Sequence, residues 1–576
     1  MDIKRIALIV ALAGIAYAIV IQWNADYGQN GSRVSPQPKV AQDSSIPPLP
    51  NESLAQTTQA IGASASNQVN IDHDVPAVEV EVNEALPEQE NPVADYKYIR
   101  VKTDNLDVLI NPIGGDVEST TLLKHLIHLN NPDNHFVLLE KNNLRTYVAQ
   151  SGLIGKDGID NKAGGRPLFH SAQPSYVLEE GKDSLDVSLF YDVNNVRFQK
   201  IFHFTRNSYR IDVEYLVTNQ SDKTWQGNLF AQIKRDRSEL TEDEGVPLGV
   251  KPFLGAAYWT PDKPYIKYDF NDFHEAPIKQ IINGGWVAFL QHYFVNAWVA
   301  PKESANTYST RVNSRGEYII GFTSPAMVIQ PGQQQSTAIT LYSGPKDQDV
   351  LQELSPGLDL TVDYGWLWFV GQPIFQFMSF IHTFVGNWGW SIIILTFCIK
   401  LLFYPLSAAS FRSMANMRRV QPEMARLKEL HGDDRQAMSQ GMMELYRKEK
   451  VNPLGGCLPI LIQMPVFISL YWVIMESVEV RHAPFMLWIE DMSVMDPYFA
   501  LPLIMGVTMY IQQSLNPTPP DPMQAKIMKM MPIGFTFMFM WFPSGLVLYW
   551  VVNNTLSIIQ QYVITKKIEK AAASKS

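Results

Sequence analysis

The chain has 576 residues, with 47 Lys and Arg against 57 Asp and Glu, which gives a formal net charge of −10. This acidic balance excludes a general nucleic-acid-binding protein, because such a protein needs a basic face to meet the phosphates. The only two cysteines, Cys398 and Cys457, lie in or beside apolar segments of the last third. The long polar segment before them therefore does not depend on disulfide bonds.

The N-terminus predicts a membrane anchor. Lys4 and Arg5 precede an apolar segment from Ile6 to Ile21, as in a signal peptide or a retained signal anchor. A cleavage site requires small residues at the end of such a segment, whereas here the large Trp23, a residue typical of membrane interfaces, follows. We therefore prefer a retained anchor over residues 1–22, with its basic end in the cytoplasm, and keep a cleaved signal peptide as the alternative.

The next two segments are predicted to lie in the periplasm. Residues 23–95 are rich in Pro, Gln, Ser, Asn and acidic residues, so they predict a disordered tether. Between residues 96 and 345, short alternating segments separated by turn residues predict an all-β sandwich. The clearest strand candidates are Tyr98–Lys102, Leu106–Ile110, Ser184–Tyr191, Phe198–Phe204, Tyr209–Val217 and Ala338–Ser343.

The predicted sandwich carries no catalytic motif. It has no nucleophile elbow, P-loop or dinucleotide-binding glycine pattern, and His274-Glu275 lacks the second histidine of a zinc protease. We therefore expect no catalytic residue, no metal and no cofactor. A sandwich of this size has room for a carbohydrate or a peptide in a groove, but we prefer a scaffold or a partner-docking role.

Charge decides how the following apolar runs meet the membrane. Two runs, Tyr364–Val385 and residues 390–406, precede Phe411–Lys450, which carries nine basic and six acidic residues and is expected in the cytoplasm. Only one of the two runs can then cross. We expect residues 346–388 to connect the sandwich to an amphipathic helix along the outer interface, and the run from Trp390 to be the second span.

Further spans complete a predicted helical membrane core over residues 389–570. The candidates are Leu458–Met475, Pro497–Gln513, Ile527–Phe542 and Leu546–Ile564. With the anchor and the run from Trp390 this makes six spans, an even number that leaves the basic N-terminus and the tail, residues 571–576, in the cytoplasm. Several spans are shorter than the about 20 residues that a ~30 Å hydrocarbon core requires, which predicts local thinning of the bilayer.

One cation lies inside this core. Lys400 falls within the second span, where a charge costs on the order of 3 kcal/mol, and the predicted interiors of the other spans contain no acidic residue. At about 100° per residue, Thr396 and Ser407 share its arc of the helix. A second polar stripe follows one face of the last span and consists of Tyr549, Asn553, Ser557 and Gln560.

We interpret the two stripes as the walls of a common hydrophilic groove in which Lys400 meets a transient acidic ligand. The alternative is that the small polar residues only hydrogen-bond helices together and that Lys400 extends to the cytoplasmic surface.

The basic segment, residues 411–452, predicts a cytoplasmic helical hairpin. We expect one helix over Pro422–Leu430, a turn at residues 431–434, and a second helix to about Lys450 that is capped by Asp433 or Asp434. One face of the second helix carries Met438, Met442 and Leu445. Such a face indicates either ordinary packing, which we prefer, or an adaptable surface for apolar segments.

Short motifs in the last third resemble those of the YidC insertases. They are Asp363-Tyr364-Gly365-Trp366, Gly386-Asn387-Trp388-Gly389-Trp390, Asn452-Pro453-Leu454-Gly455-Gly456-Cys457-Leu458-Pro459, Gln463-Met464-Pro465 and Trp541-Phe542-Pro543-Ser544-Gly545-Leu546. The anchor, the tether and the large outer domain resemble those of the Gram-negative members. The resemblance implies a non-enzymatic chaperone of the bacterial inner membrane that inserts integral membrane proteins and helps them fold, alone or with the Sec translocon, without hydrolysing a nucleotide.

The resemblance also implies roles for single residues. The family's groove in the inner leaflet usually holds an arginine, and Lys400 matches that position, which keeps the charge but loses the planar fork. Thr396 matches the polar residue one turn earlier, and Tyr549 with Trp550 matches an aromatic pair that meets substrates, with Trp550 in place of a tyrosine. The implied partners are nascent membrane proteins, membrane lipid, the Sec translocon and ribosomes, with no specific nucleic-acid target.

Two other functions fit parts of the sequence. A polytopic transporter or channel also uses an intramembrane lysine, but it would favour inverted repeats, which we do not find. A membrane-anchored periplasmic binding module needs an anchor only, which six spans and a buried lysine exceed.

Overall fold

The computed structural model divides into two compact units, residues 2–74 and residues 75–576. The residues that it describes are 74–76, 97–162, 164–238, 252–432, 434–449, 458–516 and 522–573. The anchor predicted over residues 1–22 and nearly all of the tether predicted over residues 23–95 lie outside these ranges. All helices and strands below belong to the second unit.

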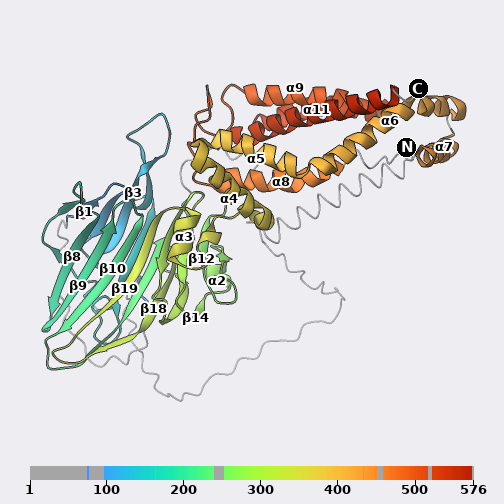
Figure 1. Ribbon diagram of the computed structural model, residues 1–576. Helices are drawn as coiled ribbons and strands as arrows, with labels where there is room; N and C mark the ends of the chain where they lie inside the picture. Colours follow the sequence, from blue (N-terminus) through green and yellow to red (C-terminus); the bar gives the residue numbers. More distant parts are fainter. Residues whose placement is uncertain are drawn as a thin grey trace, which may run out of the picture. The chain divides into compact units, whose positions relative to one another are not determined.

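Two β-sheets form the first half of this unit (Figure 1). The ten-stranded sheet has the order β14-β17-β18-β11-β5-β4-β3-β2-β1-β7, and the nine-stranded sheet has the order β13-β12-β15-β16-β19-β10-β9-β8-β6. Neighbouring strands are antiparallel except β1 and β7, which are parallel.

The strands of the ten-stranded sheet are β1 Ile99–Lys102, β2 Leu106–Asn111, β3 Asp116–Leu126, β4 His135–Lys141, β5 Thr146–Ile154, β7 Ser175–Val177, β11 Trp225–Arg235, β14 Lys279–Asn283, β17 Ala305–Val312 and β18 Tyr318–Ile329. Those of the other sheet are β6 His170–Ser171, β8 Ser184–Val193, β9 Val196–Thr205, β10 Arg210–Asn219, β12 Gly255–Tyr258, β13 Ile266–Tyr268, β15 Trp286–Leu290, β16 Phe294–Val299 and β19 Gln334–Pro345. All six strand candidates from the sequence are confirmed as strands.

Alternation of side chains explains why these segments pair as they do. In β9, every second residue from Val196 to Phe204 is buried while the residues between them are more exposed, and β10 has the same period of two. Buried side chains from both sheets form one continuous hydrophobic core, and a smaller separate cluster lies on the nine-stranded sheet and includes Leu351, a residue of the helix that follows the last strand. This sheet-rich architecture agrees with the predicted all-β sandwich.

A lysine occupies one of these inward positions. Lys200 of β9 is fully buried, and its Nζ donates hydrogen bonds to the carbonyl oxygens of Gly114 (3.2 Å), Gly115 (2.8 Å) and Ser151 (3.2 Å). Beside it, Arg166 forms ion pairs with Asp116 and Asp160. The alternating pattern did not predict this polar network, because it treats each inward position as apolar.

The helices follow the last strand. They are α3 Gln348–Leu354, η2 Asp359–Thr361, η3 Gly365–Leu367, α4 Trp368–Val385, α5 Trp388–Leu402, α6 Tyr404–His431, α7 Arg435–Lys448, α8 Leu458–Glu476, α9 Ala500–Ser514, α10 Pro522–Phe539 and α11 Ser544–Ala573, with the short α2 Asp272–Glu275 inside the β region. Helix α11 packs against α5, α6 and α9, and α4 packs against α5 and α8. Their apolar side chains form a second core, separate from that of the sheets.

Among the residues described, no single helix is both long and apolar enough to cross a membrane. Helices α5 and α6 meet that requirement only as a pair, which is bent by 68° at Phe403. Pro405 explains the bend, because it has no N–H with which to continue the hydrogen bonds of α5, and it is well placed in the first turn of a new helix.

The bend corrects two boundaries predicted from the sequence. We expected a span to end near Leu406 and a separate helix to begin at Pro422, but α6 is continuous from Tyr404 to His431 with Pro422 inside it. Strong helix formers such as Ala, Met and Arg fill the preceding turns and carry the helix past the proline. Helix α7 begins as predicted, with Asp434 accepting hydrogen bonds from the N–H groups of Gln436 and Ala437.

Candidate substrate groove

Lys400 contacts the last helix. It lies on α5 with 8% of its surface exposed, and its Nζ donates a hydrogen bond of 2.6 Å to Oγ of Ser557 on α11. The Ser557 hydroxyl in turn donates to the carbonyl oxygen of Asn553, at 2.7 Å. The serine therefore gives its proton to its own helix and offers a lone pair to the ammonium group.

The ammonium group has little compensation for its burial. An ammonium carries three donors, and a single hydroxyl accepts from Lys400 in the part of the chain that the structure describes. No described carboxylate forms an ion pair with it. This arrangement differs from that of a structural buried charge, which is normally paired.

The polar stripe on α11 makes contacts with three helices. Nδ2 of Asn553 donates to Oε1 of Gln463 on α8 at 3.3 Å, and Nε2 of Gln560 donates to the Tyr404 carbonyl of α6 at 3.4 Å. We call Lys400, Ser557, Asn553 and Gln463 the polar seam. The two predicted stripes do meet, through Lys400 and Ser557.

Two other predicted residues are less directly involved. Thr396 is buried on α5, and its hydroxyl donates to the Ile392 carbonyl of its own helix at 2.6 Å. Ser407 is also buried, but it lies on α6 beyond the bend. Its predicted alignment with Lys400 assumed one continuous helix, which is wrong.

The two residues of the predicted aromatic pair, Tyr549 and Trp550, lie in different surroundings. Tyr549 is almost fully buried in the apolar helical core. The Trp550 ring packs edge-on against Phe467 at 4.7 Å, and its buried Nε1 has no hydrogen-bond partner in the described structure. An unpaired buried donor is costly, so Trp550 has an unused capacity to bind a polar group.

Gln463 is the seam residue that the sequence analysis did not select as a site. It lies in the Gln463-Met464-Pro465 motif, and the signal for it was a lone amide inside an apolar run. A second polar contact was missed one turn beyond Ser557 on α11, where Nε2 of Gln561 donates to the carbonyl oxygen of Leu515 and to Oδ1 of Asn516, just after α9.

The apolar face predicted on the second hairpin helix packs mainly inward. Leu445 is buried and Met442 is partly buried against Val420 and Met424 of α6. Met438 is partly exposed and stands outside this cluster. Leu445 and Met442 therefore pack as the preferred interpretation expects, while Met438 remains accessible.

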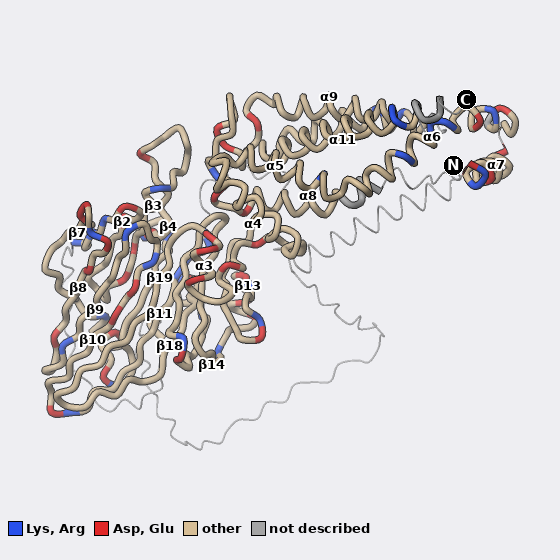
Figure 2. The backbone as a smooth tube through the Cα atoms, in the orientation of Figure 1, with Lys and Arg blue, Asp and Glu red and all other residues tan. Residues whose placement is uncertain are grey.

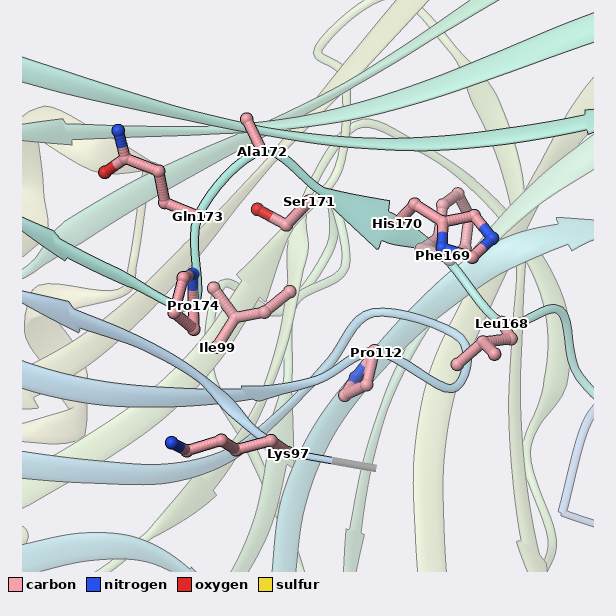
Figure 3. A pocket seen from close by; sticks show the side chains of 10 residues that line it. All are labelled: Lys97, Ile99, Pro112, Leu168, Phe169, His170, Ser171, Ala172, Gln173 and Pro174. Atoms are coloured by element: carbon pink, nitrogen blue, oxygen red, sulfur yellow. The ribbon is translucent and has the colours of Figure 1, made fainter. Parts of the chain in front are cut away.

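A hollow of about 380 Å³ opens on the β region (Figure 3). Polar side chains of His170, Ser171 and Gln173 stand beside the apolar Ile99 and Phe169. The hydroxyl of Ser171 is 2.7 Å from that of Tyr176, and no described carboxylate pairs with His170. The Ser171 hydroxyl is therefore engaged by Tyr176.

Comparison with known proteins identifies the family. Residues 98–377 match the model of the YidC periplasmic domain, and residues 380–571 match that of the 60Kd inner membrane protein. A protein of Pseudomonas fluorescens strain SBW25 is 55% identical over 574 residues, which cover 100% of this chain and 99% of that one. The chain belongs to the YidC family of membrane protein insertases.

A second curated relative agrees with this membership. A protein of Pseudomonas aeruginosa strain LESB58 is 52% identical over 594 residues, covering 99% of this chain and 100% of the relative, and both proteins are named membrane protein insertase YidC. A crystal structure of an active YidC insertase with its first transmembrane domain resolved aligns with a TM-score of 0.37 and 18% identity, over 81% of this chain and 92% of that one. The family resemblance read from the motifs is confirmed, and the transporter and binding-module alternatives give way to it.

Proposed function

We propose that this family member inserts and helps fold integral membrane proteins by offering Lys400 to the acidic flank of an incoming segment. The observation that carries the proposal is the 2.6 Å contact between Nζ of Lys400 and the Ser557 hydroxyl, without a carboxylate partner among the described residues. A hydroxyl is a weaker acceptor for an ammonium than a carboxylate is. A client carboxylate can therefore displace Ser557 at a net gain.

The proposed topology has six spans with both termini in the cytoplasm, the β region in the periplasm and α4 along the outer interface. Charge supports this arrangement. In Figure 2, α9 and most of α11 lack charged residues, whereas basic residues gather on α6, on α7 and at the end of α11. A basic cluster of this kind stays on the cytoplasmic side, so it sets the orientation of the helices between.

In the proposed mechanism the polar seam opens into a hydrophilic groove. A client's polar flank enters between α5, α8 and α11, where Lys400 neutralises its charge and Asn553 and Gln463 replace water as hydrogen-bond partners. The apolar part of the client then moves into lipid. Charge-assisted hydrogen bonds contribute about 1.5–3 kcal/mol, enough to lower the barrier for a short acidic flank without nucleotide hydrolysis.

The hairpin of α6 and α7 is proposed to receive clients first. Met443 is 56% exposed and Met438 is partly exposed, and flexible thioether side chains adapt to varied apolar segments. We further propose that the Sec translocon and ribosomes deliver clients to this side, as the family resemblance implies.

The test is the insertion of a two-span client with an acidic outer loop into proteoliposomes that contain this protein alone. We expect Lys400→Arg to keep activity, and Lys400→Ala to insert the client about tenfold more slowly, because one charge-assisted contact is lost. The matched control is Lys566→Ala, an exposed lysine on α11. Equal activity of Lys400→Ala and wild type would refute the role of the cation, and a client with a neutral loop should insert equally well in both.

A further inference from the structure

A second pocket, of about 310 Å³, lies among α3, α4, the start of α5 and the loop after α8. Its acidic members are Asp347, Asp349 and Glu479. Phe375, Ser379 and His382 of α4 and Trp388 of α5 complete the wall together with Gln348. We call this space the α4 pocket.

The acidic side of the α4 pocket has no cationic partner among the residues that the structure describes. Asp347 accepts hydrogen bonds from the N–H groups of Asp349 and Val350 as the cap of α3. No described lysine or arginine pairs with Asp347, Asp349 or Glu479. Burial and the two aspartates raise the pKa of Glu479 to about 8, which reflects three carboxyl groups facing one space without compensation.

The other side of the pocket is aromatic. The His382 ring stacks on Trp388 with centroids 4.2 Å apart, and Phe375 stacks on the same indole at 6.3 Å. Burial lowers the pKa of His382, so the imidazole is uncharged at neutral pH. Aromatic faces combined with carboxylates are the surroundings that organic ammonium groups prefer.

The position of the pocket on α4 indicates the source of the ammonium. The opposite face of this helix exposes the large apolar side chains of Phe369, Phe377, Phe380 and Phe384, which are 41–76% exposed, with Gln376 and Thr383 among them. An amphipathic helix with such a face lies in the membrane interface. The pocket therefore opens beside lipid headgroups, if α4 lies at the membrane surface as proposed above.

We propose that the α4 pocket binds the ammonium headgroup of an ethanolamine phospholipid. A primary ammonium brings three hydrogen-bond donors to the carboxylates of Glu479, Asp347 and Asp349, whereas a trimethylammonium brings none. The volume holds a headgroup and leaves the acyl chains outside, next to the exposed aromatic face of α4. An anionic headgroup is repelled by the same carboxylates.

The test uses the full-length protein in detergent with three phospholipids of identical acyl chains, bearing ethanolamine, choline or glycerol headgroups. Native mass spectrometry counts the lipids retained. We expect the ethanolamine lipid to be retained over the other two. Glu479→Gln should weaken its retention about tenfold, because a bound ammonium lowers the pKa of Glu479 and keeps it ionised, and this charge-assisted hydrogen bond is lost. The matched control is Glu490→Gln, an exposed carboxylate of the same loop, which should behave as wild type.

Thermal unfolding separates loss of binding from loss of fold. Because its pKa is raised, Glu479 is largely protonated at neutral pH when no ammonium is bound, so the similarly shaped amide of Glu479→Gln should leave the unfolding temperature unchanged. Asp349→Asn is a second, independent variant. Equal retention of ethanolamine and choline lipids, or undiminished retention in both variants, would overturn the proposal. Because no client is present, such a failure leaves the proposal for Lys400 standing.

A lysine tripeptide forms the second arm of the experiment. If the wild-type protein binds the tripeptide and Glu479→Gln does not, while lipid retention is the same in both, the ammonium comes from a basic protein segment. That outcome overturns the lipid assignment.

Discussion

Lys200 in the β region and Lys400 in the helical region are both buried, and their surroundings differ. Lys200 in the β region has three backbone carbonyls as acceptors, lies near Asp116 and Asp160, and stands over the rings of Phe202 and Tyr215. Lys400 in the helical region has one serine hydroxyl. Both are buried cations, so burial alone does not separate a structural lysine from a functional one. The number and kind of hydrogen-bond acceptors around the ammonium group separate the two.

Replacement of each lysine by methionine tests this difference most strongly. Lys200→Met leaves the Gly115 carbonyl without its ammonium donor, although Arg166 still reaches Gly114 and Ser151. We expect a loss of stability on the order of 2 kcal/mol. Lys400→Met loses one hydrogen bond but also removes a poorly compensated cation, so we expect unchanged or higher stability.

The measurement is thermal unfolding of the full-length variants in detergent, with fluorescence from each region. Lys223→Met, an exposed lysine of the β region, is the matched control and should change nothing. If Lys400→Met were destabilised, or if Lys200→Met were as stable as wild type, the acceptors would not determine what each lysine contributes to stability.

The sequence predicted the two regions unequally, for physical reasons. Strands and the apolar core followed from periods of two and from turn residues, as Phe198–Phe204 within β9 illustrates. The network around Lys200 was missed because its partners are carbonyl groups, which every residue has. The bend at Phe403 was missed because Pro405 allows either a bent pair or one kinked helix, and tertiary packing decides between them.

Only part of the candidate site was predicted from the sequence. Lys400 and Ser557 were selected because each stands out in an apolar helix, and the structure brings them together. Gln463 was not selected because helical periodicity locates residues within one helix and says nothing about which helices become neighbours. Ser407 was placed with Lys400 only by extending one helix through the bend.

The next largest expected difference between the two regions is in how their stability changes at acid pH. Burial lowers the pKa of His125 to about 4 and that of His292 to about 3, and Nε2 of His292 lies 2.7 Å from the Met475 carbonyl, for which the neutral ring is the donor. An unfolded histidine takes up its proton near pH 6.5, so between pH 6.5 and about 4 the unfolded state binds more protons than the folded one. Stability of the β region is therefore lost as pH falls through this window, by up to about 2 kcal/mol for each of the two histidines at pH 5.

Helices α5 and α8 to α11 contain no histidine, and the raised pKa of Glu479 after α8 lets the folded helical region hold a proton that the unfolded chain has lost. This region should therefore lose less stability than the β region as pH falls in this window. Unfolding temperatures of the two regions, measured from pH 7 to pH 4.5, check the expectation. His292→Gln keeps a donor for Met475 and should flatten the pH dependence. An equal acid response of both regions would show that these histidines do not control it.

The smallest expected effect concerns the partner of Lys400. In Ser557→Ala the ammonium loses its hydroxyl acceptor, which costs about 1 kcal/mol in a buried position. The same loss makes Lys400 more available to a client carboxylate, because no resident acceptor has to be displaced. We therefore expect insertion of a client with an acidic loop to be equal to or about twofold faster than in wild type, with a slightly lower unfolding temperature. Thr555→Ala, an exposed hydroxyl on the same helix, is the control. If Ser557→Ala instead lost activity as Lys400→Ala does, the serine would act with the lysine on the client, and the description of Ser557 as a displaceable acceptor would be wrong.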